Sequence, residues 1–167
     1  MAFRALAPID AIGFEGDVVA TEYGTGEVVR FSTADPESRT TMASGLNGPA
    51  GLATHGGDLY VSENHAGRIL KLSPDGTTEV LAEGLAGPEG LAIAGGLLYV
   101  VEAGAGRLTS IDLATGATTL VADGLETHVP PTGTFPGTML FNGVAISGDR
   151  AYVSGDKINV IYTVDLN

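Results

Sequence analysis

The chain has 167 residues, 44% of them hydrophobic, and a formal net charge of −12 from 20 acidic and 8 basic residues. This composition fits one folded domain and excludes a disordered chain. Because an acidic surface repels phosphate backbones, we expect no nucleic-acid partner. The sequence contains no cysteine, which excludes disulfides, thiolate metal sites and cysteine catalysis.

The sequence carries no run of apolar residues long enough to span a membrane, and its first residues lack the apolar region of a signal peptide. We therefore expect no membrane partner. With Met1 as the native start, the expected location is the cytoplasm. If the chain is instead a processed form, a secreted or periplasmic location fits as well.

Four copies of a repeat of roughly 40 residues follow one another along the chain. They cover approximately residues 8–44, 45–83, 84–123 and 124–167. The clearest match aligns residues 45–53, GLNGPAGLA, with residues 84–92, GLAGPEGLA. The same alignment places LYVSE at 59–63 over LYVVE at 98–102, and Asp17 of the first copy over Asp58.

Each copy contains four short β-type runs that are separated by glycine-rich turns. In the second copy we predict strands at 51–54, 58–62, 68–72 and 78–82, with an Asp75-Gly76 hairpin turn before the last. We label these strands A to D. Four antiparallel strands per repeat of this length predict an all-β fold, a β-propeller with four blades in a single unit that spans 1–167.

The two ends of the chain predict how the propeller closes. The fourth copy ends with a third strand at 158–166, and residues 2–6 resemble a strand D without a sheet. Pairing these two would remove exposed strand edges. It would either close one four-bladed ring or join two chains into a larger ring, and a fragment of a longer protein is a third reading. We favour two chains, and so predict a homodimer.

Three repeated motifs carry a family resemblance. They are Pro-x-Gly-Leu-Ala at 49–53 and 88–92, Leu-Tyr-Val-x-Glu at 59–63 and 98–102, and the Gly-Arg pairs that follow. They resemble the blades of NHL-repeat and gluconolactonase/regucalcin-like propellers, and streptogramin lyases look similar. Members of these families usually have six or seven blades, whereas this chain has four. In a propeller, ligands usually approach the face that carries the B–C and D–A connections.

Three glutamates, Glu22, Glu63 and Glu102, occupy equivalent positions after strand B, where the fourth copy has Gly155. Around a channel mouth they could bind Ca2+ or Mg2+, which prefer oxygen ligands. Alternatively, each carboxylate accepts backbone N–H groups of its own turn. The repeated Arg68 and Arg107 are predicted to bridge adjacent blades.

Two polar residues interrupt the repeat pattern in the D–A connections. Glu89 and Asn142 stand where the other copies have Ile9 and Ala50, and folding alone would not require this difference. In the gluconolactonase/regucalcin-like family, Asn and Asp in Pro-Asn-Gly and Pro-Asp-Gly segments bind the metal. The resemblance therefore implies that Asn142 and Glu89 are metal ligands.

About 13 additional residues lie in the fourth D–A connection, within an insertion at 126–141. The insertion is either a lid or a plug of the channel. Its His128, and His65 beside Glu63, are candidate general bases. Streptogramin lyases use His and Glu with Mg2+, so the resemblance implies such a role for His65.

Two functions therefore remain open from the sequence. The first is a β-propeller scaffold or binding module with a site for a small-molecule ligand at the channel mouth. The alternative is a metal-dependent, lactonase-like hydrolase or a lyase that acts on a small molecule.

Overall fold

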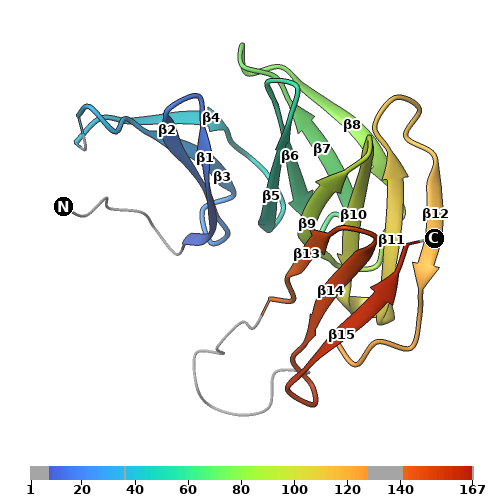
Figure 1. The fold of residues 1–167 in the computed structure, drawn as a ribbon. Coiled ribbons are helices and arrows are strands. Elements are labelled where there is room, and N and C mark those ends of the chain that lie inside the picture. Colours follow the sequence, from blue (N-terminus) through green and yellow to red (C-terminus); the bar gives the residue numbers. More distant parts are fainter. Residues whose placement is uncertain (1–7, 36, 128–140, 167) are drawn as a thin grey trace, which may run out of the picture.

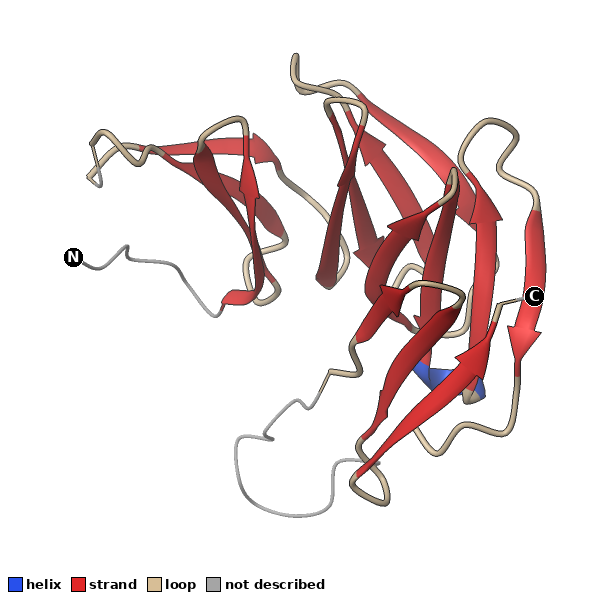
Figure 2. Ribbon diagram, viewed as in Figure 1, coloured by secondary structure: helices blue, strands red, loops and turns tan. Residues whose placement is uncertain are grey.

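The computed structural model describes residues 8–35, 37–127 and 141–166. Almost all of its regular structure is β (Figure 2). Blade 1 contains β1 (Pro8–Phe14), β2 (Asp17–Glu22), β3 (Glu27–Phe31) and β4 (Arg39–Ala43). Blade 2 contains β5 (Pro49–His55), β6 (Asp58–Glu63), β7 (Arg68–Leu72) and β8 (Thr78–Glu83).

Blade 3 contains β9 (Pro88–Ala94), β10 (Leu97–Glu102), β11 (Arg107–Asp112) and β12 (Thr118–Ala122), with a short 3-10 helix at Ala103–Ala105. Blade 4 contains β13 (Val144–Ser147), β14 (Arg150–Gly155) and β15 (Val160–Asp165). In each sheet the strands pair antiparallel in chain order. The prediction of an all-β propeller is confirmed, and the fourth sheet has three strands among the described residues.

The four sheets follow one another around an open arc, with blades 1 and 4 at its two ends (Figure 1). The predicted pairing of residues 2–6 lies outside the described residues, so it stays a prediction. Within the described ranges, no helix is long and apolar enough to cross a membrane.

Apolar clusters between successive blades form the core. Val19 and Val28 of blade 1 pack with Leu59 and Val61 of blade 2. The same arrangement joins blade 2 to blade 3 and blade 3 to blade 4. Each blade thus has a trailing face, turned towards the next blade along the chain, and a leading face, turned towards the preceding one.

Glycine allows the inner strands to approach one another closely. A Cβ atom at Gly51 in β5 would lie 2.3 Å from the carbonyl oxygen of Glu89, and one at Gly90 in β9 would lie 2.5 Å from that of Asn142. These separations exclude any side chain without backbone movement. The glycines of the Pro-x-Gly segments therefore set the spacing of the inner strands.

Candidate functional site

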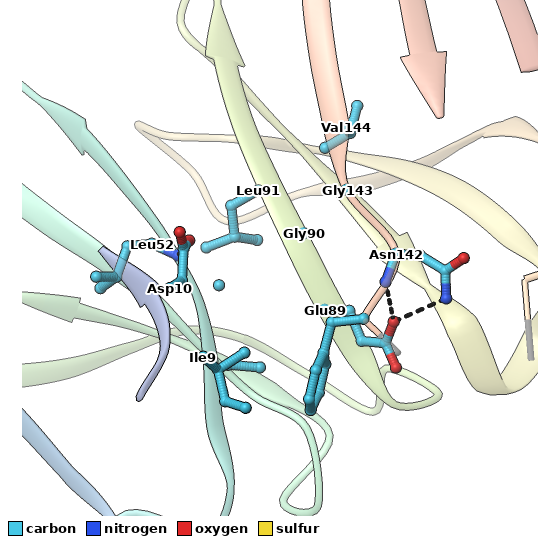
Figure 3. A pocket seen from close by; sticks show the side chains of 12 residues that line it. Ile9, Asp10, Leu52, Glu89, Gly90, Leu91, Asn142, Gly143 and Val144 are labelled. Atoms are coloured by element: carbon cyan, nitrogen blue, oxygen red, sulfur yellow. Dashed lines mark hydrogen bonds between the residues drawn. The ribbon is translucent and has the colours of Figure 1, made fainter. Parts of the chain in front are cut away.

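A pocket of about 350 Å³ lies where the inner strands of all four blades converge (Figure 3). This volume falls within the range of small-molecule sites. Its lining comes from β1, β5, β9, β13 and the segment before β13. The lining residues are Ile9, Asp10, Ala50, Gly51, Leu52, Glu89, Gly90, Leu91, Phe141, Asn142, Gly143 and Val144.

Glu89 and Asn142 meet in this pocket, and both are buried. The backbone N–H of Asn142 donates to Glu89 Oε2 at 2.7 Å, and its side-chain Nδ2 donates to the same oxygen at 2.9 Å (Figure 3). Asn142 Nδ2 also donates to the carbonyl oxygen of Thr127. The two residues that interrupt the repeat pattern therefore hold each other in place.

Asp10 is a second acidic residue of the pocket, and it was not among the residues predicted from the sequence. Its Oδ2 accepts the backbone N–H of Leu52 at 2.8 Å, and in Figure 3 it lies towards Leu52, away from Asn142. The signal was present in the repeat alignment, because Asp10 stands where blade 2 has Gly51 and blade 3 has Gly90. A side chain at a position that is otherwise glycine is a departure of the same kind as Glu89.

His65 lies beside Tyr23, a second residue that was not predicted from the sequence. The Tyr23 hydroxyl and His65 Nε2 are 2.7 Å apart, and the rings meet edge to face with centroids 5.2 Å apart. Tyr23 also contacts Phe141 of the pocket lining, at 5.3 Å between centroids. Burial raises the pKa of Tyr23, and the negative charge of Glu89 raises it further. The Tyr23–His65 pair therefore adjoins the pocket.

The three repeated glutamates bind arginines, and none of their side chains is exposed. Their partners are Arg39 for Glu22, Arg68 for Glu63 and Arg107 for Glu102.

Two of these carboxylates also accept backbone N–H groups of the segment that leads into their own blade. Asn47 donates to Glu63, and Ala86 donates to Glu102, both at 2.7 Å. The carboxylates thus have structural partners, but the donors lie in the D–A connection and not, as the sequence had led us to expect, in the glutamate's own turn. The prediction that Arg68 and Arg107 bridge adjacent blades is wrong, because each binds a glutamate of its own blade.

The described residues do not converge on a metal ion. Among them, no group of three His, Asp or Glu side chains could hold a metal ion. Glu89 and Asn142 face each other as acceptor and donor, whereas two metal ligands would both turn oxygens towards the ion. The prediction of Ca2+ or Mg2+ at Glu89, Asn142, Glu22, Glu63 and Glu102 stays untested. His128 and most of the insertion lie outside the described residues.

The fold and this pocket define a β-propeller with a concave site at the centre of its blades. No known family matches by its sequence model, and no curated protein matches. Among solved structures, the chain is similar to a nidogen/laminin complex, with 22% identity and a TM-score of 0.73 over 90% of this chain and 56% of that one.

Two further structures show the same fold. A virginiamycin B lyase from Staphylococcus aureus has 15% identity and a TM-score of 0.70 over 95% of this chain and 55% of that one. The computationally designed Ika4 protein has 13% identity and a TM-score of 0.63 over 98% of this chain and 94% of that one. The chain thus spans just over half the length of the nidogen and lyase structures. The resemblance to streptogramin lyases is confirmed at the level of the fold.

Proposed function

We propose that this propeller is a binding module whose central pocket holds a small organic cation. The observation that carries the proposal is Glu89, a buried carboxylate in the pocket at a position where the repeat has Ile9 and Ala50. Folding of the blade does not need an acid there. A ligand that binds to this carboxylate accounts for the presence of an acid at this position.

The other lining residues support a cationic ligand with an apolar body. Asp10 adds a second carboxylate, and none of the twelve described lining residues is basic. Leu52, Leu91 and Val144 supply apolar surface, and Phe141 supplies an aromatic ring that can receive a cation on its face. The net charge of −12 also raises the local concentration of cations.

Two matched probes test this proposal: benzylammonium and benzyl alcohol, which share a ring and differ in charge. Binding to the native state raises the melting temperature. Benzylammonium should raise it for the wild type, and benzyl alcohol should raise it much less. The Glu89→Gln variant should lose at least about tenfold in affinity for benzylammonium, since it loses one charged contact.

Glu79→Gln is the control, because Glu79 is an exposed carboxylate on β8 and does not line the pocket. It should respond to benzylammonium as the wild type does. Equal responses to both probes, or an unchanged response of Glu89→Gln, would contradict the proposed site.

A lyase-type activity is the second candidate, and the contact between Tyr23 and His65 supports it. A tyrosine hydroxyl hydrogen-bonded to an imidazole can exchange a proton with a substrate bound nearby. Because a virginiamycin B lyase shares the fold, quinupristin, which is bound in one structure of such a lyase, is the substrate to assay. Consumption should be lost in His65→Ala and kept in His55→Ala, whose histidine is exposed at the end of β5. No consumption by the wild type removes this candidate.

A further inference from the structure

Two aromatic rings from distant parts of the chain meet on the side of the pocket that holds Glu89. Phe141 lines the pocket and directly precedes Asn142, whose backbone N–H donates to Glu89 at 2.7 Å. Tyr23, which follows β2, meets Phe141 edge to face, with the ring planes at 63° and the centroids 5.3 Å apart. Both aromatic residues are partly exposed, so a small molecule can reach their rings.

Contacts with blade 2 hold Tyr23 in place. Its hydroxyl lies 2.7 Å from His65 Nε2, and its ring meets the imidazole edge to face. Gly48 packs against this pair, because a Cβ atom there would lie 3.1 Å from Tyr23 Cε2 and 3.1 Å from His65 Nδ1. Burial raises the pKa of the Tyr23 hydroxyl, and the negative charge of Glu89 raises it further, so the ring lies within the field of that carboxylate. Two oriented rings therefore adjoin an anionic group.

The carboxylates of the pocket already accept hydrogen bonds from the protein. Glu89 Oε2 accepts both the backbone N–H and the side-chain Nδ2 of Asn142. Asp10 Oδ1 accepts the N–H of Ala11, and its Oδ2 accepts that of Leu52, both at 2.8 Å. A primary ammonium that leaves water needs an acceptor for each of its three N–H groups. A quaternary ammonium has no N–H, so it can use the charge of these carboxylates and leave their hydrogen bonds intact.

We propose that the cation held in this pocket is a quaternary ammonium group, with Phe141 and Tyr23 against its methyl groups and Glu89 as its counter-charge. This inference rests on the function proposed above and narrows its ligand class. The faces of aromatic rings attract such a cation, and its methyl groups can also bury against Leu52 and Leu91 of the lining. The pocket volume of about 350 Å³ is near the lower end for small-molecule sites, which suits a compact head group.

Calorimetric titration with benzylammonium and benzyltrimethylammonium tests the inference, because the two cations differ only in whether the nitrogen carries hydrogens or methyl groups. The trimethyl cation should bind the wild type at least about tenfold more tightly, since its methyl groups are buried against the rings. In Phe141→Leu the two dissociation constants should come within about threefold of each other, because the ring is lost and apolar volume is kept. Tyr23→Leu should reduce the preference in the same direction.

Two further variants control for indirect effects on folding. Tyr152→Leu removes an exposed tyrosine of β14 that does not line the pocket, so it should keep the wild-type ratio of dissociation constants. Tyr23→Phe should also keep this ratio, because the ring remains when the contact of its hydroxyl with His65 is lost. Thermal melting of each variant without ligand checks that it is folded.

The outcomes separate this inference from the function on which it rests. If benzylammonium binds in a manner that depends on Glu89 but the trimethyl cation binds no more tightly, the quaternary ligand class is wrong and the binding function stands. If neither cation binds the wild type, both are wrong. An unchanged preference in the folded Phe141→Leu and Tyr23→Leu variants would overturn the role of the two rings.

Discussion

The Glu102 carboxylate is unexposed and has partners on three sides: Arg107, Thr109 and the backbone N–H of Ala86. Burial raises its pKa, but these hydrogen bonds and the charge of Arg107 outweigh burial, so the pKa lies below the ordinary 4.5. A lowered pKa means that the ionised carboxylate stabilises the fold above pH 4.5, and that this stability is lost as the pH falls through the folded-state value.

Glu102→Gln should therefore lower the free energy of unfolding at neutral pH by about 2 kcal/mol. It should also reduce the steepness with which stability falls below pH 4.5. Denaturant unfolding at a series of pH values measures both effects. Glu79→Gln, at an exposed position, should keep the wild-type curve. If Glu102→Gln and the wild type lose stability in parallel on acidification, the carboxylate does not have this role.

Several site residues could be predicted individually, but their partners could not. Glu89 and Asn142 depart from a repeat, so the sequence alone marks them as candidates. Their mutual hydrogen bond joins residues 53 positions apart and depends on how blades 3 and 4 pack. The Tyr23–His65 contact likewise joins two blades across 42 positions. Alignment of repeats finds equivalent positions, whereas contacts between unlike positions need the three-dimensional arrangement.

At the scale of the strand, the close approach of inner strands gives a direct prediction. Gly90→Ala should destabilise the fold by about 3 kcal/mol, because its Cβ would lie 2.5 Å from the Asn142 carbonyl oxygen and 2.8 Å from the Gly143 Cα. Gly13→Ala is the matched control, since Gly13 also lies in an inner strand and its Cβ would meet nothing within 4 Å.

Thermal or denaturant unfolding of the two variants provides the comparison. If Gly90→Ala and Gly13→Ala are equally stable, β9 and the segment before β13 can move apart without a loss in the free energy of unfolding. That result would contradict the close packing at Gly90.

The strands themselves were predictable because each blade repeats the same turn and strand chemistry. The four strands expected in the second copy correspond to β5, β6, β7 and β8, and the third matches at both ends. Strand A was predicted too short, at 51–54, whereas β5 begins at Pro49 and ends at His55. Its register shifts between Pro49 and Leu52. A local irregularity of this kind does not follow from an alternating pattern.

At the scale of the whole molecule, the central pocket depends on all four blades at once. Ile9, Leu52, Leu91 and Val144 come from β1, β5, β9 and β13, one from each inner strand. A ligand held there contacts every blade, so binding should stabilise the entire arc and not one sheet. This placement connects the repeat pattern of the sequence with the proposed binding function.

The most direct test of that function is the position at which benzylammonium binds. Backbone amide NMR signals should be followed during a titration of the wild type and of Glu89→Gln. We expect saturable shifts that concentrate on Leu52, Glu89, Leu91 and Val144 in the wild type and weaken strongly in the variant. Shifts scattered over the outer strands, or identical titrations of the two proteins, would contradict a ligand site at the centre of this propeller.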